Sequence, residues 1–224
     1  MISFELVSKS FKQQKVLDQV SLIIERGEFV SLIGESGVGK STFINLLLGA
    51  LTPSKGRILV NGQDLQEFSE NALALYRRGL GAVFQDFKLL PRKTVFENVA
   101  FALEVCGAAP GFIDTRVQEV LEIVGLTAKA QALPAEISGG ECSRVGIARA
   151  LVHEPALVLA DEPTGNLDPE TSKTIIQLLQ KINEAGATVV LATHDLINVQ
   201  RLQKRVIKLK QGRIASDLVA ISQC

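Results

Sequence analysis

The residues with the clearest chemical potential lie near the N-terminus. Residues 34–41 read GESGVGKS and match the pattern GxxxxGK[ST], in which the backbone N–H groups of a glycine-rich loop bind phosphate. An apolar run precedes the segment and a helical pattern follows it, which is the context that the motif requires. We expect Lys40 to reach the β- and γ-phosphates, Ser41 to ligate Mg²⁺ and Thr42 to reach the α-phosphate. The predicted nucleotide-binding residues of this loop are Gly34, Glu35, Ser36, Gly37, Val38, Gly39, Lys40, Ser41 and Thr42.

Two carboxylates follow an apolar run much later in the chain. Residues 157–160 are predicted to form a buried strand, and Asp161 and Glu162 come directly after it. Because the carboxyl ends of strands in an α/β sheet face the ligand crevice, these acids are expected beside the phosphate loop. We predict that Asp161 holds Mg²⁺ through water and that Glu162 orients or deprotonates the attacking water.

Two further polar side chains follow predicted strands. His194 comes after the apolar run 188–193, and we expect it to donate a hydrogen bond to the γ-phosphate. Gln85 comes after residues 80–84, where its amide could ligand Mg²⁺ or hold water and couple the γ-phosphate to movement of the segment that follows. His153 lies in a turn beside Glu154 and is interpreted as structural.

A second glycine pair opens a predicted helix. Ser138 and Glu141 have the spacing of a capping box, which explains them as ordinary helix-start residues. Gly139 and Gly140 at a helix N-terminus also form a potential anion site. Because one phosphate loop is already present about 100 residues earlier, we expect two copies of the chain to pair so that each contributes one half of a shared phosphate site.

The pattern of apolar residues around these motifs predicts an α/β architecture. Helices are expected at 40–48, 95–105, 113–124 and 140–151, and from Asp168 to about Ala185. The stretch from Thr94 to about Leu151 is helical throughout and is interpreted as an insertion. The expected strands are 2–7, 20–24, 29–33, 57–60, 80–84, 157–160, 188–192, 206–209 and 213–215.

Composition narrows the class of protein. The 224 residues fit one large domain or a core with an inserted subdomain, and 24 basic against 24 acidic residues argue against a nucleic-acid partner bound by bulk positive charge. The longest apolar runs have five residues, so no membrane span or signal peptide is expected. Cys106, Cys142 and Cys224 are widely spaced, which favours free thiols in a reducing, cytoplasmic compartment.

Together these motifs resemble those of ABC-type ATPases over essentially the whole chain. GESGVGKS resembles the Walker A motif, ISGGE the signature, LVLADE the Walker B motif, residues 165–168 the D-loop, and His194 the switch histidine. The resemblance implies a P-loop NTPase fold with a RecA-like core. It places an N-terminal antiparallel β subdomain and that core in residues 1–86 and 153–224, and a helical subdomain in residues 87–152.

The resemblance also implies an ATPase that works as a homodimer around two Mg-ATP. The Walker A motif of one copy would face Ser138, Gly139 and Gly140 of the other, with D-loop residues Asn166 and Asp168 nearby. Phe11 falls where the family stacks an aromatic ring on adenine; it keeps the stacking face of the more usual tyrosine and lacks the hydroxyl. Val16 is expected to pack near the base.

Within this family, the stretch 84–99 resembles the cell-division ATPases of the FtsE type. The sequence DEPTGNLD fits the wider group that also holds lipoprotein-release (LolD) and efflux (MacB) ATPases, which is the alternative. The resemblance implies a peripheral position at the cytoplasmic face of the inner membrane, through a polytopic FtsX-type partner. A non-hydrolysing nucleotide sensor is a third possibility, against which the intact Glu162 and His194 argue. The expected docking residues are Phe87, Leu89, Leu90, Val95 and Val99.

The chain departs from its group in the helix behind the signature. Cys142 and Ser143 stand where the group usually has two glutamines, and Gly146 replaces a usual alanine. The glycine costs roughly 1 kcal/mol of local helix stability. These departures bear on dimer affinity and hydrolysis rate, and a helix N-terminus could lower the pKa of the Cys142 thiol.

Overall fold

The computed structural model describes residues 1–165 and 167–218. Its strands are β1 (Ile2–Phe11), β2 (Gln14–Ile24), β3 (Phe29–Ile33), β4 (Lys55–Val60), β5 (Gln63–Asp64), β6 (Leu80–Phe84), β7 (Leu157–Asp161), β8 (Thr188–Thr193), β9 (Arg205–Lys210) and β10 (Arg213–Leu218). Its α-helices are α1 (Lys40–Leu47), α2 (Glu70–Arg78), α3 (Val95–Val105), α4 (Pro110–Ile123), α5 (Gly139–Leu151), α6 (Pro169–Glu184) and α7 (Leu196–Leu202). Short 3₁₀ turns lie at Leu65–Glu67, Thr127–Lys129 and Pro134–Glu136.

The strands form two sheets. Four antiparallel strands in the order β2-β1-β4-β5 make the first, and the order β10-β9-β3-β8-β7-β6 makes the second. In the second sheet β9, β3, β8, β7 and β6 run parallel, whereas β10 pairs with β9 as an antiparallel edge. The predicted α/β class with its N-terminal antiparallel sheet is therefore confirmed.

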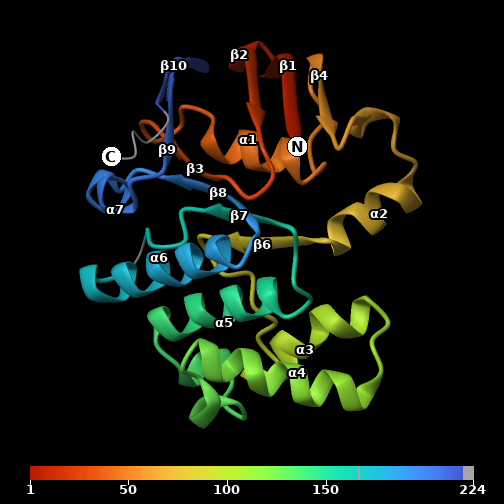
Figure 1. The fold of residues 1–224 in the computed structure, drawn as a ribbon, viewed down its shortest axis with the longest axis vertical. Coiled ribbons are helices and arrows are strands. Elements are labelled where there is room, and N and C mark those ends of the chain that lie inside the picture. The colour runs from red at the N-terminus through yellow and green to blue at the C-terminus, as the bar shows by residue number, and fades with distance from the viewer. Residues whose placement is uncertain (166, 219–224) are drawn as a thin grey trace.

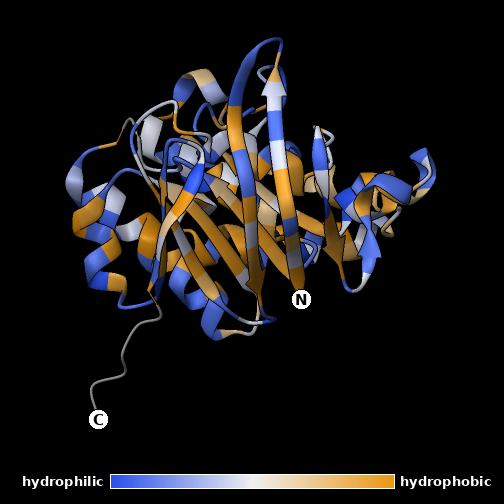
Figure 2. Ribbon diagram, turned by 90° about the horizontal axis from the view of Figure 1, so that it is seen from above, coloured by the Kyte–Doolittle hydropathy of each residue, from blue (hydrophilic) through white to orange (hydrophobic). Residues whose placement is uncertain are grey.

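The parallel sheet separates two hydrophobic cores, because alternate residues of a strand face opposite sides. In β8, Val189 and Leu191 belong to the core shared with α3, α4, α5 and α6. Val190 and Ala192 belong to the core shared with α1 and the antiparallel sheet. Figure 1 shows this layering, with α3, α4 and α5 below the parallel sheet and β1, β2 and β4 above it. Figure 2 shows that the strands at the centre are mostly hydrophobic.

The predicted helix starts are confirmed where the chain supplies a cap. Thr94 with Glu97 and Ser138 with Glu141 form complete capping boxes, and Asp168 caps α6 ahead of Pro169. Two helices were not predicted. The largely polar α2 has no buried residue, and α7 has only seven residues. No helix in the described part of the chain combines the length and the apolar character needed to cross a membrane.

Candidate nucleotide-binding site

Four neighbouring strands bring the predicted chemical groups to one edge of the parallel sheet. The loop of residues 34–39 leaves β3, His194 leaves β8, Glu162 leaves β7 and Gln85 leaves β6, in the spatial order of these strands. Parallel strands end at the same edge, so the side chains converge although they are far apart in sequence. They line a cavity of about 550 Å³ whose residues are Val16, Ser36, Gly37, Gly39, Lys40, Ser41, Thr42, Gln85, Glu162 and His194.

The glycine loop is fitted closely against two other segments. A Cβ on Gly34 would lie 2.7 Å from the carbonyl oxygen of Leu209 in β9. A Cβ on Gly39, whose φ is 113°, would lie 3.1 Å from the carbonyl oxygen of Val16. Only glycine combines this backbone conformation with such close approach. Predicted Glu35 and Val38 belong to the same loop but do not line the cavity.

Lys40, Glu162 and His194 form a continuous polar chain at this cavity. The buried Lys40 ammonium lies 3.3 Å from Glu162 Oε1 and donates to the carbonyl oxygen of Gly34 at 2.9 Å. The other oxygen, Glu162 Oε2, lies 2.8 Å from His194 Nδ1 and accepts the His194 backbone N–H at 3.3 Å. The side chain of Glu162 is 12% exposed and that of His194 is 65% exposed. The cavity therefore holds a cation, a carboxylate and a solvent-accessible imidazole in successive contact.

Asp161 has the character of a cation ligand. Burial raises the pKa of its carboxyl group, while a hydrogen bond from Ser41 acts in the opposite direction. Its Oδ1 atom is buried and has no hydrogen-bond partner among the described residues. A buried, unpartnered carboxylate oxygen next to a hydroxyl fits a hard divalent cation such as Mg²⁺, which prefers oxygen ligands.

Gln85 lines the cavity at the start of a segment that other elements hold in place. Its amide lies near Gly165, since a Cβ there would be 3.3 Å from Gln85 Nε2. Beyond it, Arg149 of α5 donates to the carbonyl oxygens of Phe87 and Lys88 at 2.8 and 2.7 Å. The fully buried Asn98 of α3 makes four hydrogen bonds with residues 90–94. Asn98 and Arg149 cannot be predicted from the sequence, because neither belongs to a motif and their partners are backbone carbonyl and N–H groups.

The signature residues lie at the start of α5, outside the cavity of their own chain. Ser138 and Gly139 are exposed, whereas Gly140 and Glu141 are half-buried. The backbone N–H of Ser138 donates to Glu141 and lowers the pKa of that carboxyl group. A Cβ on Gly140 would lie 2.7 Å from Cγ2 of Thr171 in α6. The start of α5 therefore contacts α6 but presents two residues to solvent.

Other predicted residues lie at the margins. Val16 lines the cavity, but Phe11 lies at the β1–β2 turn, 44% exposed, with the Lys9 ammonium 5.3 Å from its ring centre. Asn166 of the D-loop lies outside the described residues. Asp168 caps α6 and accepts a hydrogen bond from the Thr171 hydroxyl at 2.6 Å.

Cys142 is half-buried, and burial together with the Glu141 charge raises its thiol pKa, so the suggested lowering is wrong.

The predicted docking surface is partly wrong. Val95 and Val99 are fully buried in the core beneath α3, because they lie on the helix face that packs on α4 and α5. Phe87, Leu89 and Leu90 are half-buried and precede α3. Of these, Leu90 lines a groove of about 610 Å³ between α2, α3 and α5.

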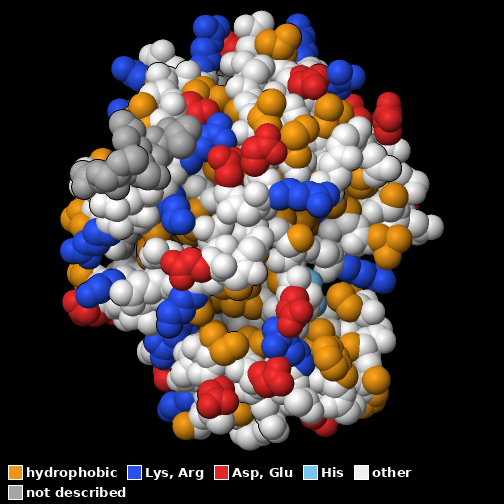
Figure 3. Space-filling view, viewed as in Figure 1, with side chains coloured by type: hydrophobic (Ala, Val, Ile, Leu, Met, Phe, Trp, Pro, Cys, Tyr) orange, Lys and Arg blue, Asp and Glu red, His pale blue; other side chains and the backbone are white. Residues whose placement is uncertain are grey.

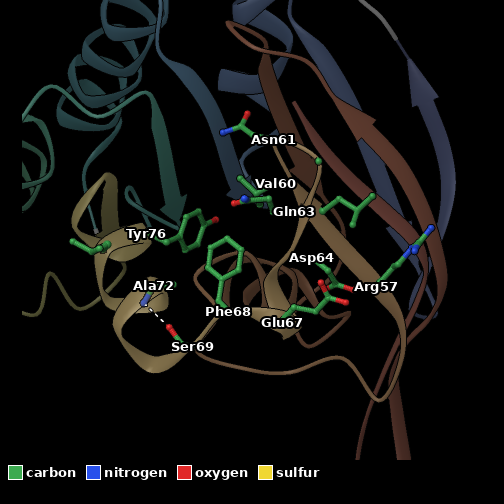
Figure 4. A pocket seen from close by; sticks show the side chains of 13 residues that line it. Arg57, Val60, Asn61, Gln63, Asp64, Glu67, Phe68, Ser69, Ala72 and Tyr76 are labelled. Atoms are coloured by element: carbon green, nitrogen blue, oxygen red, sulfur yellow. Dashed lines mark hydrogen bonds between the residues drawn. The ribbon is translucent and has the colours of Figure 1, made fainter.

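A further cavity of about 820 Å³ lies between the β4–β5 hairpin and α2 (Figure 4). Phe68 and Tyr76 meet edge to face in it, with ring centres 5.9 Å apart. The Tyr76 hydroxyl donates to the carbonyl oxygen of Leu47 at 2.7 Å, which ties α2 to α1. None of the predicted site residues lines this cavity.

Comparison with known proteins assigns the family. Residues 17–165 match the family model described as ABC transporter. The chain belongs to this ABC transporter family, as one of its ATPases. It is 50% identical to the cell division ATP-binding protein FtsE of Bacillus subtilis, over 97% of this chain and 96% of the relative. It is also 50% identical to FtsE of Mycobacterium tuberculosis, over 97% of this chain and 95% of the relative.

A solved structure shares the whole fold of this ABC ATPase. The ATP-binding cassette MJ0796, in a dimeric post-hydrolysis state with ADP and Pi, superposes with a TM-score of 0.91 at 37% identity. The match covers 99% of this chain and 100% of that one. The fold is therefore that of an ABC ATPase, with the antiparallel β subdomain and the parallel sheet described above.

Proposed function

We propose that this ABC ATPase acts as a homodimer that hydrolyses ATP to drive a membrane partner in cell division, as the name of its FtsE relatives indicates. The observation that carries the proposal is the series of contacts from Lys40 to Glu162 and from Glu162 to His194, in the cavity that the glycine loop also lines. Each of these residues has a role in phosphoryl transfer to water. In this proposal residues 87–152 form the helical subdomain, and the rest form the core and β subdomain.

The chemistry divides among the residues of the cavity. The loop N–H groups and Lys40 bind the β- and γ-phosphates, with Thr42 at the α-phosphate. Glu162 orients the attacking water and accepts its proton, and the exposed His194 donates to the γ-phosphate. Mg²⁺, when bound, supplies positive charge beside the phosphoryl oxygens. The residues that would hold it are Ser41, Gln85 and Asp161.

The exposed start of α5 completes the site in a dimer. Ser138 and Gly139 are accessible at a helix N-terminus, where free N–H groups favour an anion. In the proposed arrangement this helix end faces the ATP held by the other protomer. Glu141, Asn166 and Asp168 then lie at the same interface. Phe11 is assigned to the adenine ring and Val16 to its edge.

In this proposal the partner docks in the groove between α2, α3 and α5, which keeps Leu90 of the expected docking surface and excludes the buried Val95 and Val99. Phe84, Leu90, Phe101 and Val105 supply its apolar lining. Its charged lining residues are Arg77, Arg78, Lys88 and Arg149. Figure 3 shows a hollow on this face between the upper and lower parts of the molecule, where hydrophobic, basic and acidic side chains and a histidine are exposed. An amphipathic helix with acidic residues, on a cytoplasmic loop of an FtsX-type protein, complements this surface and places the ATPase at the membrane.

Two substitutions test the catalytic assignment. Glu162→Gln is expected to slow ATP hydrolysis by about 10²–10⁴-fold while ATP binding and dimerisation persist, because the amide cannot accept the proton from water. Lys40→Ala is expected to abolish tight ATP binding, because the phosphates lose their buried cation. Wild-type turnover by Glu162→Gln, or wild-type affinity in Lys40→Ala, would remove that residue from its role.

The partner assignment is tested by co-purification. Phe101→Glu, in the groove, is expected to abolish capture of an FtsX-type protein and to leave the ATPase activity of the free subunit intact. Ile123→Glu, on α4 and 62% exposed, is the matched control and is expected to capture the partner normally. Capture of a lipoprotein-release or efflux permease in place of the FtsX-type protein would reassign the partner.

A further inference from the structure

The buried hydroxyl of Ser143 connects the signature helix to the loop that carries Glu162. Ser143 is 0% exposed, and its Oγ donates to the carbonyl oxygen of Pro163 at 3.1 Å. Ser143 lies on α5, five residues after the exposed Ser138. Pro163 follows Glu162 directly and is itself buried. The hydrogen bond therefore joins two elements that both belong to the catalytic assembly.

Two glycines of α5 also lie against the segment after Glu162. Gly139 lies against Leu167, since a Cβ on it would be 3.9 Å from Cδ2 of Leu167. Gly140 lies against Thr171, where a Cβ would come within 2.7 Å. Ser143 supplies the polar contact of the set and the one nearest to Glu162 in sequence. A shift of α5 is therefore transmitted to this segment.

The backbone of Glu162 makes its side-chain position sensitive to such a shift. Its φ is 48°, in the left-handed region that a residue with a Cβ adopts at a cost. On one side its N–H donates to the carbonyl oxygen of Ala192 at 2.8 Å, and its own carbonyl oxygen accepts the N–H of Gly165 at 3.1 Å. On the other side the next carbonyl, that of Pro163, is fixed by Ser143. Loss of that bond removes the hydrogen bond that this carbonyl oxygen receives from the described residues and frees one flank of the strained residue.

We infer that Ser143 is a positioning residue, which holds Glu162 in its catalytic orientation through Pro163 and ties it to the signature helix. The inference rests on the proposed function, in which the signature helix contacts the ATP of the other protomer. Closure of that helix on one nucleotide then reaches, through Ser143, the carboxylate that serves the second nucleotide. The serine that departs from the family's usual glutamine thus acquires a specific task in this chain.

Steady-state kinetics of Ser143→Ala test the inference. We expect kcat for ATP hydrolysis to fall about tenfold, with the KM for ATP unchanged within about twofold, because the loop that binds phosphate is untouched. Ser143→Thr keeps the hydroxyl and is expected to restore most of kcat. Ser143→Cys keeps the side-chain volume with a poor donor and is expected to behave like the alanine variant. Ser31→Ala is the matched control, because Ser31 is similarly buried and its hydroxyl has no partner in the part of the chain that the structure describes.

A double-mutant comparison separates positioning from a general structural role. If Ser143 acts through Glu162, adding Ser143→Ala to Glu162→Gln leaves the residual single-turnover rate unchanged. An equal drop in both backgrounds, or a wild-type kcat in Ser143→Ala, would overturn the inference. Thermal unfolding and ATP-analogue binding of Ser143→Ala show whether a lower kcat reflects misfolding. If Ser143→Ala misfolds, the kcat values of Ser143→Thr and Ser143→Cys test the inference instead. Full turnover by Glu162→Gln alone would instead overturn the proposed role of Glu162.

Discussion

Two loops leave the parallel sheet at the same edge and are held in different ways. Residues 34–39 connect β3 to α1 and fit by backbone proximity, with Gly34 against Leu209 and Gly39 against Val16. Residues 85–94 connect β6 to α3 and are held by side chains of other elements, namely Asn98 of α3 and Arg149 of α5. The first loop is fixed by its own sequence, whereas the second takes its shape from the helices around it.

This difference suits two tasks. A loop that binds phosphate must keep its N–H groups aimed, and tight backbone packing leaves it one conformation. The loop beside the proposed docking groove is expected to follow any shift of α3 and α5, because Asn98 and Arg149 on those helices donate hydrogen bonds to its carbonyl oxygens. The two loops therefore combine different kinds of support at one sheet edge, where β8 and β7 lie between the strands that carry them.

The largest effect is expected from removing the support of the second loop. Asn98→Ala leaves several buried backbone groups of residues 90–94 unsatisfied, which should lower the free energy of unfolding by about 3–5 kcal/mol. Denaturant unfolding measures this. Asn183→Ala is the control, because Asn183 is also buried but bonds to Gly27 and Ala187. We expect both variants to lose stability and only Asn98→Ala to lose partner-stimulated hydrolysis. An equal loss of partner-stimulated hydrolysis in both variants would contradict the special role of the second loop.

A smaller effect is expected from disturbing the contact between Gly212 and Val16, which packs against Gly39 of the first loop. Gly212 in the β9–β10 turn has a φ of 74°, and a Cβ on it would lie 2.5 Å from the carbonyl oxygen of Val16. Gly212→Ala should therefore displace Val16 from the cavity, weaken ATP binding about tenfold and cost about 2–3 kcal/mol of stability. Isothermal titration with ATP measures the affinity. Gly62→Ala has the same backbone strain, with φ of 83°, and no neighbour within 4 Å, so its ATP affinity should not change.

The smallest effect concerns pH and the groove beside the second loop. Burial lowers the pKa of His153 below its ordinary 6.5, although a hydrogen bond with the carbonyl oxygen of Leu80 opposes this. The unfolded chain therefore binds the proton more readily, so stability is present above pH 6.5 and is lost as the pH falls below it toward the lowered value. His153→Gln should flatten this part of the stability profile. An unchanged profile between pH 7.5 and 5.5 would assign the acid sensitivity to other groups.

The sequence predicts most of the first loop and little of the second. The spacing of Gly34, Lys40 and Ser41 encodes the binding geometry locally, so the cavity and the strands around it could be anticipated. The family resemblance places a docking surface at Val95 and Val99, whereas α4 and α5 cover this face of α3, and periodicity reveals an apolar face but not whether another helix covers it. The roles of Asn98 and Arg149 depend on contacts across 4 to 62 residues with backbone groups, which carry no side-chain signature.

The strand order β3-β8-β7-β6 has one more consequence. Hydrogen-bonded strands lie about 4.8 Å apart, so the ends of these four strands are evenly spaced over roughly 15 Å. The ladder of main-chain bonds sets the separation between the phosphate loop and Gln85, with His194 and Glu162 between them. Exterior helices can therefore change their sequence to suit a different neighbour while the reacting groups keep their intervals.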